Sequence, residues 1–433
     1  MIKKLLITIS SIITIIIICI ILNIMQIKTI DVKVLSANDN ILLVEDKNHI
    51  KYKFNYNTNN IIINSKSKIK YNKLNKKIID FKVTSKYQEI PNDWIDNGIF
   101  SKYYNLALEK LKGLSLEEKV GQLFLVKYNE QNDINNLKKY KFGGYVFYKK
   151  DFDNKTKEDV QNMINNLQNN TNIPLLTSVD EEGGTVVRIS TNKNLYHYPF
   201  KSPNELYNLG KFELIKEDTI NKSILLNELG INLNLAPIVD VTTNKNDYMY
   251  KRSIGLSTEL TEEYAKTVIE TSKNYPVSYT LKHFPGYGNN IDTHISTSLD
   301  TRTYEDILKN DIPPFETGIK SGAEAVLISH NIVTSIDEIN PASLSPKVIN
   351  ILKKELNFTG IIITDDLDME ATKNIEDTSV KALLAGNTLL ITTNYENITK
   401  VINAVENNII EEELINQLAF KILAWKYYKG LLK

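Results

Sequence analysis

The sequence predicts an α/β protein: a (β/α)8 barrel preceded by a small all-β module and an N-terminal transmembrane helix. Three observations support this prediction. Eight short apolar runs alternate with amphipathic stretches over residues 105–433, which is typical of successive β/α units. Residues 28–88 alternate apolar and polar positions in short runs, separated by Asn, Asp and Ser. Residues 1–27 contain a long apolar segment without charge.

The N-terminal segment is long enough to cross a bilayer. The 21 residues Leu5–Met25 carry no charged side chain and would span about 30 Å as a helix. Lys3 and Lys4 precede them, which places the rest of the chain outside the cytoplasm. The alternative is a cleaved signal peptide, but the run is long for one and no small-residue cleavage site follows. A lipoprotein at Cys19 is disfavoured by the bulky Ile18. We expect a single-pass cell-membrane protein or, if the segment is cleaved, a secreted one.

Charge is divided unequally between the modules. The chain holds 52 Lys+Arg and 52 Asp+Glu, and this zero net charge argues against nucleic-acid binding through bulk charge. Residues 28–88 nevertheless hold 13 lysines and five acidic residues. Alternating runs at 30–34, 41–44, 50–54, 61–63, 69–71 and 78–83 predict five or six strands, hence a small basic β-barrel-like module or sandwich. Its simplest role is a spacer, although its lysines also suit an anionic cell-wall polymer or lipid head groups.

The large module, residues 105–433, is expected to form a TIM-type barrel. Ser115 and Glu118 have the spacing of a capping box that opens its first helix. Further helices are expected at 261–274 and 345–356. No Gly-x-Gly-x-x-Gly and no P-loop occurs, so nucleotide cofactors have no support. Eight parallel strands fit a closed barrel better than an open sheet, and we place them at residues 122–127, 145–148, 175–179, 232–239, 278–282, 325–329, 361–364 and 388–392.

Barrels of this kind carry their chemistry where the strands end, and polar residues gather at those positions here. They include Asp180 after the third strand, Asp240 after the fourth, Lys282-His283 after the fifth, Ser329-His330 after the sixth and Asp365-Asp366 after the seventh. We expect His330 to form the pocket wall or serve a structural role.

The sequence argues against three other kinds of site. No Gly-x-Ser-x-Gly elbow accompanies the histidines, which argues against a serine hydrolase. No His-Glu-x-x-His spacing occurs and Cys19 is the single cysteine, so neither a zinc site nor a disulfide is expected. Glu181 and Glu182 are adjacent in an extended stretch, so their side chains point opposite ways and cannot flank one bond. We expect no metal and no organic cofactor.

At these motifs the sequence resembles glycoside hydrolase family 3, most closely its single-domain β-N-acetylglucosaminidase branch, over roughly residues 110–430. The family's usual second α/β domain has no room in this chain, which favours that branch. The segments that support the resemblance are Lys282-His-Phe-Pro-Gly with Asp292-x-His294 downstream, Asp180-x-Glu-Gly-Gly, Leu235-Ala-Pro-Ile-Val-Asp240, Pro341-Ala-Ser-Leu-Ser345 and Gly360-Ile-Ile-Ile-Thr-Asp-Asp-Leu-Asp-Met369.

The resemblance implies the catalytic residues of a retaining glycosidase. Asp365 stands where the family has its nucleophilic aspartate, and a carboxylate can attack an oxocarbenium-like carbon and later leave. Asp292 and His294 match the branch's acid/base pair on a mobile loop, in which the carboxylate fixes and stabilises the imidazole. Asp366 and Asp368 are expected to be acids at a helix start.

The resemblance also implies a set of substrate-binding residues. These would hydrogen-bond the sugar hydroxyls or the N-acetyl group, and they are Asp180, Arg188, Arg252, Lys282 and His283. The sequence departs from the family at Tyr287, where His is frequent, and at 289–290, where Asp-Thr is frequent. The loop before His294 also has one residue fewer than is common.

Together these features lead to one expected function and several alternatives. We expect a β-N-acetylglucosaminidase that removes terminal β-linked GlcNAc from cell-wall muropeptides or peptidoglycan fragments. The alternatives are a family 3 β-glucosidase or β-xylosidase, a GlcNAc phosphorylase, and a wall-binding protein without catalysis. The expected partners are a GlcNAc-containing glycan, the membrane through residues 1–27, and an anionic wall polymer at residues 28–88, with no nucleic acid.

Overall fold

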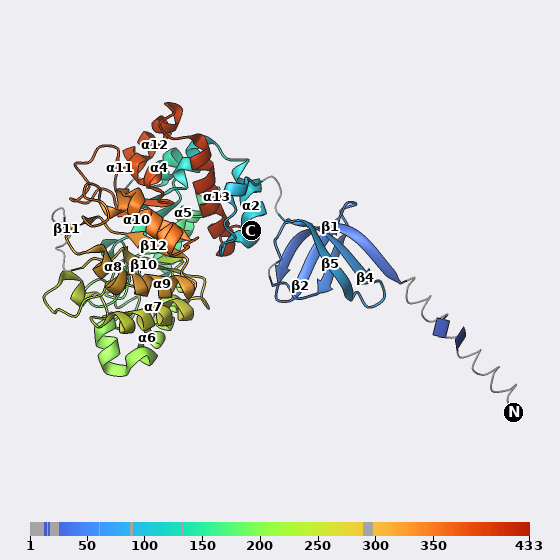
Figure 1. Ribbon diagram of the computed structural model, residues 1–433, viewed down its shortest axis with the longest axis horizontal. Coiled ribbons are helices and arrows are strands. Elements are labelled where there is room, and N and C mark those ends of the chain that lie inside the picture. The colour runs from blue at the N-terminus through green and yellow to red at the C-terminus, as the bar shows by residue number, and fades with distance from the viewer. Residues whose placement is uncertain are drawn as a thin grey trace. The chain divides into compact units, whose positions relative to one another are not determined.

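The computed structural model describes residues 13–14, 16–17, 26–59, 61–86, 90–131, 133–288 and 298–433. Backbone contacts divide the chain into two compact units (Figure 1). The first contains residues 1–95 and 101–109, and the second contains residues 96–100 and 110–433. Within the described residues, we found no helix with the length and apolarity needed to span a membrane.

The first unit is built on a five-stranded antiparallel sheet. Its strands are β1 (Ile27–Asn38), β2 (Ile41–Asp46), β3 (Lys51–Asn55), β4 (Lys66–Asn72) and β5 (Ile78–Ser85), in the spatial order β3-β2-β1-β4-β5. The alternating pattern of β4 buries Ser67, Ile69 and Tyr71 and exposes the three lysines between and before them. A single core forms on one face of the sheet, where Val34, Leu42 and Phe54 are buried.

The predicted strands of this unit are largely confirmed, but two details were wrong. The sheet is open, because β3 and β5 lie at its two edges and no closure into a barrel occurs among the described residues. Residues 61–63 were expected to be a strand and instead form a buried loop. Apolar runs of three residues do not distinguish a strand from a loop segment that covers a core.

The second unit contains a closed barrel of eight parallel strands, as the sequence predicted. Seven predicted segments match closely, whereas β9 has two residues instead of the eight expected at 232–239. Pro237 lies in that run and lacks the N–H that a continuous parallel ladder needs. In barrel order the strands are β10 (Ser278–Phe284), β12 (Ala325–Ile328), β14 (Ile361–Asp366), β15 (Leu389–Thr392), β6 (Phe124–Lys127), β7 (Gly144–Phe147), β8 (Leu176–Val179) and β9 (Leu233–Asn234).

Helices cover the outside of the barrel (Figure 1). Ser115 and Glu118 form the predicted capping box at the start of α3, and the predicted helix 261–274 is α7. The predicted helix 345–356 is the short α10 followed by a π-helical turn at Ile351–Glu355. The α-helices are α2 (Tyr104–Leu111), α3 (Leu116–Gly121), α4 (Asp133–Tyr140), α5 (Lys157–Asn169), α6 (Pro203–Glu228), α7 (Thr258–Ser272), α8 (Tyr304–Asn310), α9 (Ile312–Lys320), α10 (Pro346–Asn350), α11 (Thr378–Ala385), α12 (Glu396–Glu406) and α13 (Glu412–Tyr428).

Shorter elements complete the loops. A two-stranded parallel sheet pairs β11 (Leu299–Asp300) with β13 (Ile332–Val333) beyond the ends of the barrel strands. The described part of the chain also contains five 3₁₀ turns, at Asn92–Trp94, Ser101–Tyr103, Lys149–Asp151, Tyr248–Lys251 and Ala342–Leu344.

Candidate active site

A cleft opens at the carboxyl ends of the barrel strands and has a volume of about 390 Å³. This is the end at which a parallel barrel places its chemistry. Residues from strands β6, β10 and β14 and from the loops after β7 and β8 line it. The lining consists of Lys127, Val146, Tyr148, Asp180, Arg188, Leu235, Lys282, Leu327, Asp365, Asp366, Asp368, Met369, Glu370, Ile391 and Thr393.

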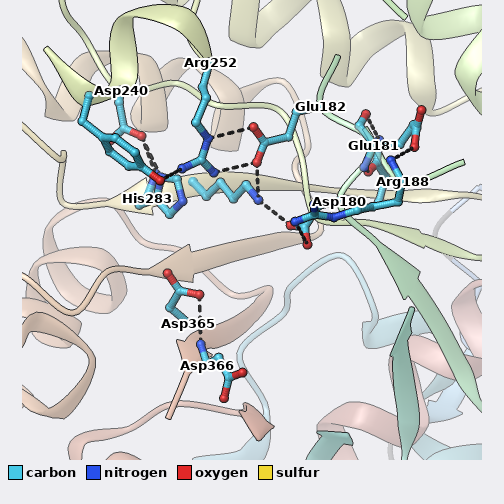
Figure 2. A network of polar contacts seen from close by, with 12 residues as sticks. Asp180, Glu181, Glu182, Arg188, Asp240, Arg252, His283, Asp365 and Asp366 are labelled. Carbon is cyan, nitrogen blue, oxygen red and sulfur yellow. Dashed lines mark hydrogen bonds and ion pairs between the residues drawn. The ribbon is translucent and has the colours of Figure 1, made fainter. Parts of the chain in front are cut away.

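Five side chains of alternating charge form a chain of ion pairs along one wall (Figure 2). Arg188 Nη2 lies 3.8 Å from Asp180 Oδ2, and Lys282 Nζ lies 2.7 Å from Asp180 Oδ1. Lys282 Nζ also contacts Glu182 Oε1 at 2.8 Å, and Arg252 holds both Glu182 oxygens at 2.7 and 3.0 Å. The chain of three cations and two carboxylates therefore carries a net charge of +1.

Side-chain exposure falls along this chain of ion pairs from Arg188 to Glu182. The side chains of Arg188 and Asp180 are 27% and 16% exposed, whereas that of Glu182 is 1% exposed. The two ends consequently suit different tasks: Asp180 and Arg188 can reach a ligand in the cleft, and Glu182 with Arg252 forms a buried support. Lys282 connects the two parts.

The buried end of the ion-pair chain is held in its charged form. Burial alone would raise the pKa of Glu182, but the charges of Arg252 and Lys282 more than offset this and hold the pKa well below its ordinary value. Burial alone would lower the pKa of Lys282, and the carboxylates of Asp180 and Glu182 raise it instead. All three ionised groups thus depend on one another.

Glu181 faces away from its neighbour Glu182, as the sequence predicted (Figure 2). Its carboxylate is fully buried and accepts hydrogen bonds from the backbone N–H groups of Arg188, Ile189 and Ser190 at 2.7, 2.8 and 3.2 Å. These bonds fold the loop after β8 back on itself. Glu181 therefore shapes the loop that presents Arg188 to the cleft.

A second buried pair joins the ends of neighbouring strands. Asp240 Oδ2 lies 2.8 Å from His283 Nδ1, and its two oxygens also accept the backbone N–H groups of His283 and Tyr287. A carboxylate accepts only, so Nδ1 of His283 carries the proton that it donates. The Tyr287 ring meets the His283 ring edge-on at 5.5 Å. The imidazole is thereby fixed in both orientation and tautomer.

Asp365 and Asp366 end strand β14 on the opposite side of the cleft from the ion-pair chain (Figure 2). The backbone N–H of Asp366 donates to Asp365 Oδ1 at 2.9 Å. Burial raises the pKa of the Asp366 carboxyl to about 6, and the nearby charges of Asp368 and Asp365 add to the effect. Two adjacent carboxylates of different environment thus face the cleft.

Asp366 and Asp368 were expected to lie at a helix start, and that expectation was wrong, since Asp366 ends strand β14. Turns follow β14, and the next α-helix, α11, begins only at Thr378. The Oδ2 atom of Asp368 instead accepts hydrogen bonds from Thr392, Thr393 and Asn394 in the loop after β15. Asp368 therefore ties two neighbouring loops of the cleft together.

His330 has the structural role expected of it. It is fully buried, and its Nε2 lies 2.9 Å from the backbone oxygen of Asp366, which can only accept. Nε2 therefore carries the proton, and Nδ1 accepts from the Ser343 hydroxyl at 2.7 Å. This arrangement fixes the backbone beside Asp365.

The structure brings together some of the predicted site residues and places others apart. Asp180, Arg188, Lys282 and Asp365 line one cleft, while Arg252 and His283 are not among its lining residues. Asp292 and His294 lie outside the described residues, so their predicted acid/base role stays a prediction.

Sequence reasoning assigned no partner role to Glu182 or Asp240, although both carry buried networks. The available signal was their position shortly after a predicted strand: Glu182 comes three residues after the predicted strand 175–179, and Asp240 directly follows the predicted strand 232–239. Among the described residues, no group of three or more His, Cys, Asp or Glu side chains is arranged to hold a metal ion.

Comparison with known proteins agrees with this geometry. The model of the glycosyl hydrolase family 3 N-terminal domain matches residues 115–424. A β-hexosaminidase of Haemophilus influenzae is 30% identical over 271 residues, which cover 61% of this chain and 76% of that protein. A β-hexosaminidase of Nitrosomonas eutropha is 30% identical over 229 residues, covering 51% of this chain and 65% of the relative.

Solved structures show the same barrel. A family 3 β-N-acetylglucosaminidase from a Paenibacillus species aligns with a TM-score of 0.69 at 28% identity, covering 74% of this chain and 63% of that one. A β-N-acetylhexosaminidase from Beutenbergia cavernae aligns with a TM-score of 0.66 at 23% identity, covering 73% and 99%. The family model covers well over half of this chain, and the chain therefore belongs to glycoside hydrolase family 3.

Proposed function

We propose that the protein is a retaining β-N-acetylglucosaminidase that hydrolyses terminal β-linked GlcNAc. The observation that carries this proposal is the placement of Asp365: its carboxylate lines the cleft across from the ion-paired side chains of Asp180, Arg188 and Lys282. A sugar ring between these walls would have hydroxyl-binding groups on one side and a nucleophile on the other. The relatives named as β-hexosaminidases support the choice of sugar.

The proposed reaction has two steps. Asp365 attacks the anomeric carbon as the bond to the leaving oxygen breaks, and His294 gives that oxygen a proton. The product of this step is a glycosyl ester on Asp365 and a neutral alcohol. His294 then takes a proton from water as the water oxygen attacks the anomeric carbon, and the carboxylate of Asp365 leaves. Asp292 would orient the imidazole and stabilise its charged form.

The substrate-binding residues act in two ways in this proposal. Asp180 accepts hydrogen bonds from sugar hydroxyls, and Arg188 and Lys282 donate to them. Arg188 is suited to this because its Nε atom is buried without a hydrogen-bond partner among the described residues. For Arg252 the geometry favours an indirect role, since its guanidinium is bidentate to Glu182. His283 is likewise held by Asp240.

The proposed location rests on the N-terminal sequence, and the proposed natural substrate rests on that location together with the family resemblance. The uncharged segment 5–25 would hold the protein in the cell membrane, and Lys3 and Lys4 would keep their end in the cytoplasm. The barrel would then meet the glycans outside the membrane. Muropeptides and other peptidoglycan fragments that carry terminal GlcNAc are the proposed substrates.

The test compares the wild-type chain with Asp365→Asn on p-nitrophenyl β-N-acetylglucosaminide. We expect the wild type to release nitrophenol and the variant to lose on the order of 10⁴-fold in kcat, because the amide cannot form the glycosyl ester. Asp153→Asn is the matched control: this exposed aspartate pairs only with Lys149 among the described residues and should leave kcat unchanged.

Three other outcomes would contradict the proposed function, and each would favour a different alternative. Faster turnover of the p-nitrophenyl glucoside or xyloside would indicate a different sugar. Release that requires inorganic phosphate, with GlcNAc 1-phosphate as product, would indicate a phosphorylase. Inactivity of the wild type on every glycoside would leave the wall-binding alternative.

A further inference from the structure

One end of the N-terminal sheet carries a compact basic surface. The turn between β4 and β5 reads Lys73-Leu-Asn-Lys-Lys77, and all five side chains are exposed. Leu74 is 77% exposed, the highest value for a large apolar residue in this unit. No ion pair among the described residues involves the three lysines of this turn. We call residues 73–77 the basic turn.

The basic turn is well ordered. The Asn72 side chain accepts the backbone N–H groups of Leu74 and Asn75 at 2.9 and 3.4 Å, and Asn75 accepts that of Lys77 at 2.9 Å. The backbone N–H of Asn72 donates to the oxygen of Lys77 at 3.0 Å, which closes the turn. Leu74 is thus held outward at the tip, between lysines.

The basic turn lies beside the start of the sheet. The backbone N–H of Lys73 donates to Gln26 O at 2.8 Å, and Ile27 pairs with Asn72. Gln26, which directly follows the uncharged segment 5–25 in the sequence, therefore lies beside the basic turn. Lys28, also exposed, adds a fourth positive charge at this end, and residues 26–29 and 71–79 contain no acidic side chain.

The opposite end of the sheet has a different character. β1 runs for 12 residues away from Gln26, about 35 Å at the rise of an extended strand. The turn at its far end contains Asp39 and no lysine. The one lysine bonded there, Lys102, gives its Nζ to Ala37 O and Asn38 Oδ1. The turn at the far end thus lacks the group of three lysines that the basic turn carries.

We propose that the basic turn docks on the surface of an anionic phospholipid membrane, with Leu74 entering the interface and the lysines meeting head-group phosphates. This inference rests on the proposed attachment of residues 5–25 to the membrane. An exposed leucine among lysines suits a lipid surface better than a wall polymer, which offers no apolar layer. Each lysine near an anionic surface favours the docked state roughly fivefold.

The experiment uses the full chain with Cys19→Ser, which removes the single cysteine, and a new cysteine labelled with an environment-sensitive fluorophore. Leu74→Cys places the label at the tip of the turn, and Asn55→Cys places a control label on an exposed residue at the far end of the sheet. Both proteins are reconstituted into vesicles of phosphatidylcholine alone or with phosphatidylglycerol.

The proposal expects a blue-shifted signal from position 74, quenched by a lipid-borne quencher, only in the anionic vesicles. Position 55 should report water in both. Changing Lys73, Lys76 and Lys77 together to Gln should lower the docked-to-undocked ratio by on the order of 100-fold, and high salt should act in the same direction. A matched triple change on or near β3, at Lys47, Lys51 and Lys53, should have little effect.

Flotation with the vesicles separates this inference from the membrane attachment. A chain that floats with both vesicle types but shows an aqueous signal at position 74 overturns the docking and leaves the attachment standing. A chain that floats only with anionic vesicles, through these lysines, supports the docking and contradicts the attachment. A chain that floats with neither overturns both. The label at position 74 could also report water on both vesicle types but become shielded from water when soluble polyphosphate is added. That result would assign the turn to a wall polymer instead.

Discussion

The Asp366→Asn substitution tests how much a carboxylate at the cleft destabilises the folded protein. Asp366 is partly buried, and this burial raises its pKa to about 6 with help from the charges of Asp368 and Asp365. Its Oδ1 atom accepts the backbone N–H of Asp368 at 3.0 Å. An asparagine oxygen can accept the same bond, so the substitution removes a charge with little change in shape.

The magnitude follows from the pKa. The unfolded chain releases this proton near pH 4 and the folded chain near pH 6, so the folded protein binds more protons in this window. Stability therefore falls as the pH rises from about 4 to about 6 and stays lower above it. The difference between about 6 and 3.8 corresponds to about 3 kcal/mol. In a unit of this size that is a rise in Tm of about 4 °C for the variant at pH 7.5.

Urea unfolding at pH 4.5, 6.0 and 7.5 measures the effect. The Asn variant should be more stable than the wild type by about 3 kcal/mol at pH 7.5, by nearly as much at pH 6.0, and by about a third as much at pH 4.5. The control Asp153→Asn removes an exposed ion pair and should change stability by about 0.5 kcal/mol or less at every pH. The reasoning would be refuted if Asp366→Asn and the wild type were equally stable at pH 7.5. It would also be refuted if the variant gained the same free energy of unfolding at every pH.

Three further changes probe the buried networks. Glu182→Gln should destabilise the protein by about 3–5 kcal/mol in urea, because Arg252 loses a charged bidentate partner in a buried site; a smaller loss would mean that water replaces the pair. Asp240→Asn should lower kcat/KM on the glycoside by up to on the order of 100-fold through a misplaced His283, and an unchanged value would contradict this. Burial lowers the pKa of Lys426 to about 7, so wild-type stability rises from pH 7 toward pH 10.5. In urea, wild-type stability should therefore rise by about 4 kcal/mol between pH 6 and pH 10, and Lys426→Met, which cannot titrate, should lack this rise; an equal rise in the variant would contradict it.

The barrel was predictable because its strands carry a strong local signal. Strands such as β7, β12 and β15 are buried at every position, and each is a mostly apolar run between polar segments. The exception is β9, where the proline shortened the ladder although the surrounding residues are still apolar. In the first unit, alternation predicted the strands, but closure of a sheet depends on pairing between its edges, which no local pattern contains.

The site was predictable in its members and less so in its pairings. Position at a strand end identified Asp180, Lys282 and Asp365, since parallel strands bring their carboxyl ends to one rim. The partners of Arg252 and His283 depend on side-chain directions from loops of irregular shape. A sequence pattern does not specify those directions, and so two predicted sugar contacts were found behind the cleft, held by Glu182 and Asp240.

The two walls of the cleft have opposite electrostatic character. The Asp366→Asn substitution should therefore change kcat as well as stability. One wall carries the ion-pair chain with its net positive charge, and the other carries Asp365, Asp366 and Asp368. An oxocarbenium-like transition state develops positive charge at the anomeric carbon beside the second wall. Ionised Asp366 would stabilise that charge from a preorganised position. We therefore expect Asp366→Asn, although more stable at pH 7.5, to lower kcat by on the order of tenfold and to remove a rise in kcat near pH 6. An unchanged kcat would mean that Asp365 alone faces the developing charge, and that burial of Asp366 destabilises the fold without helping the reaction.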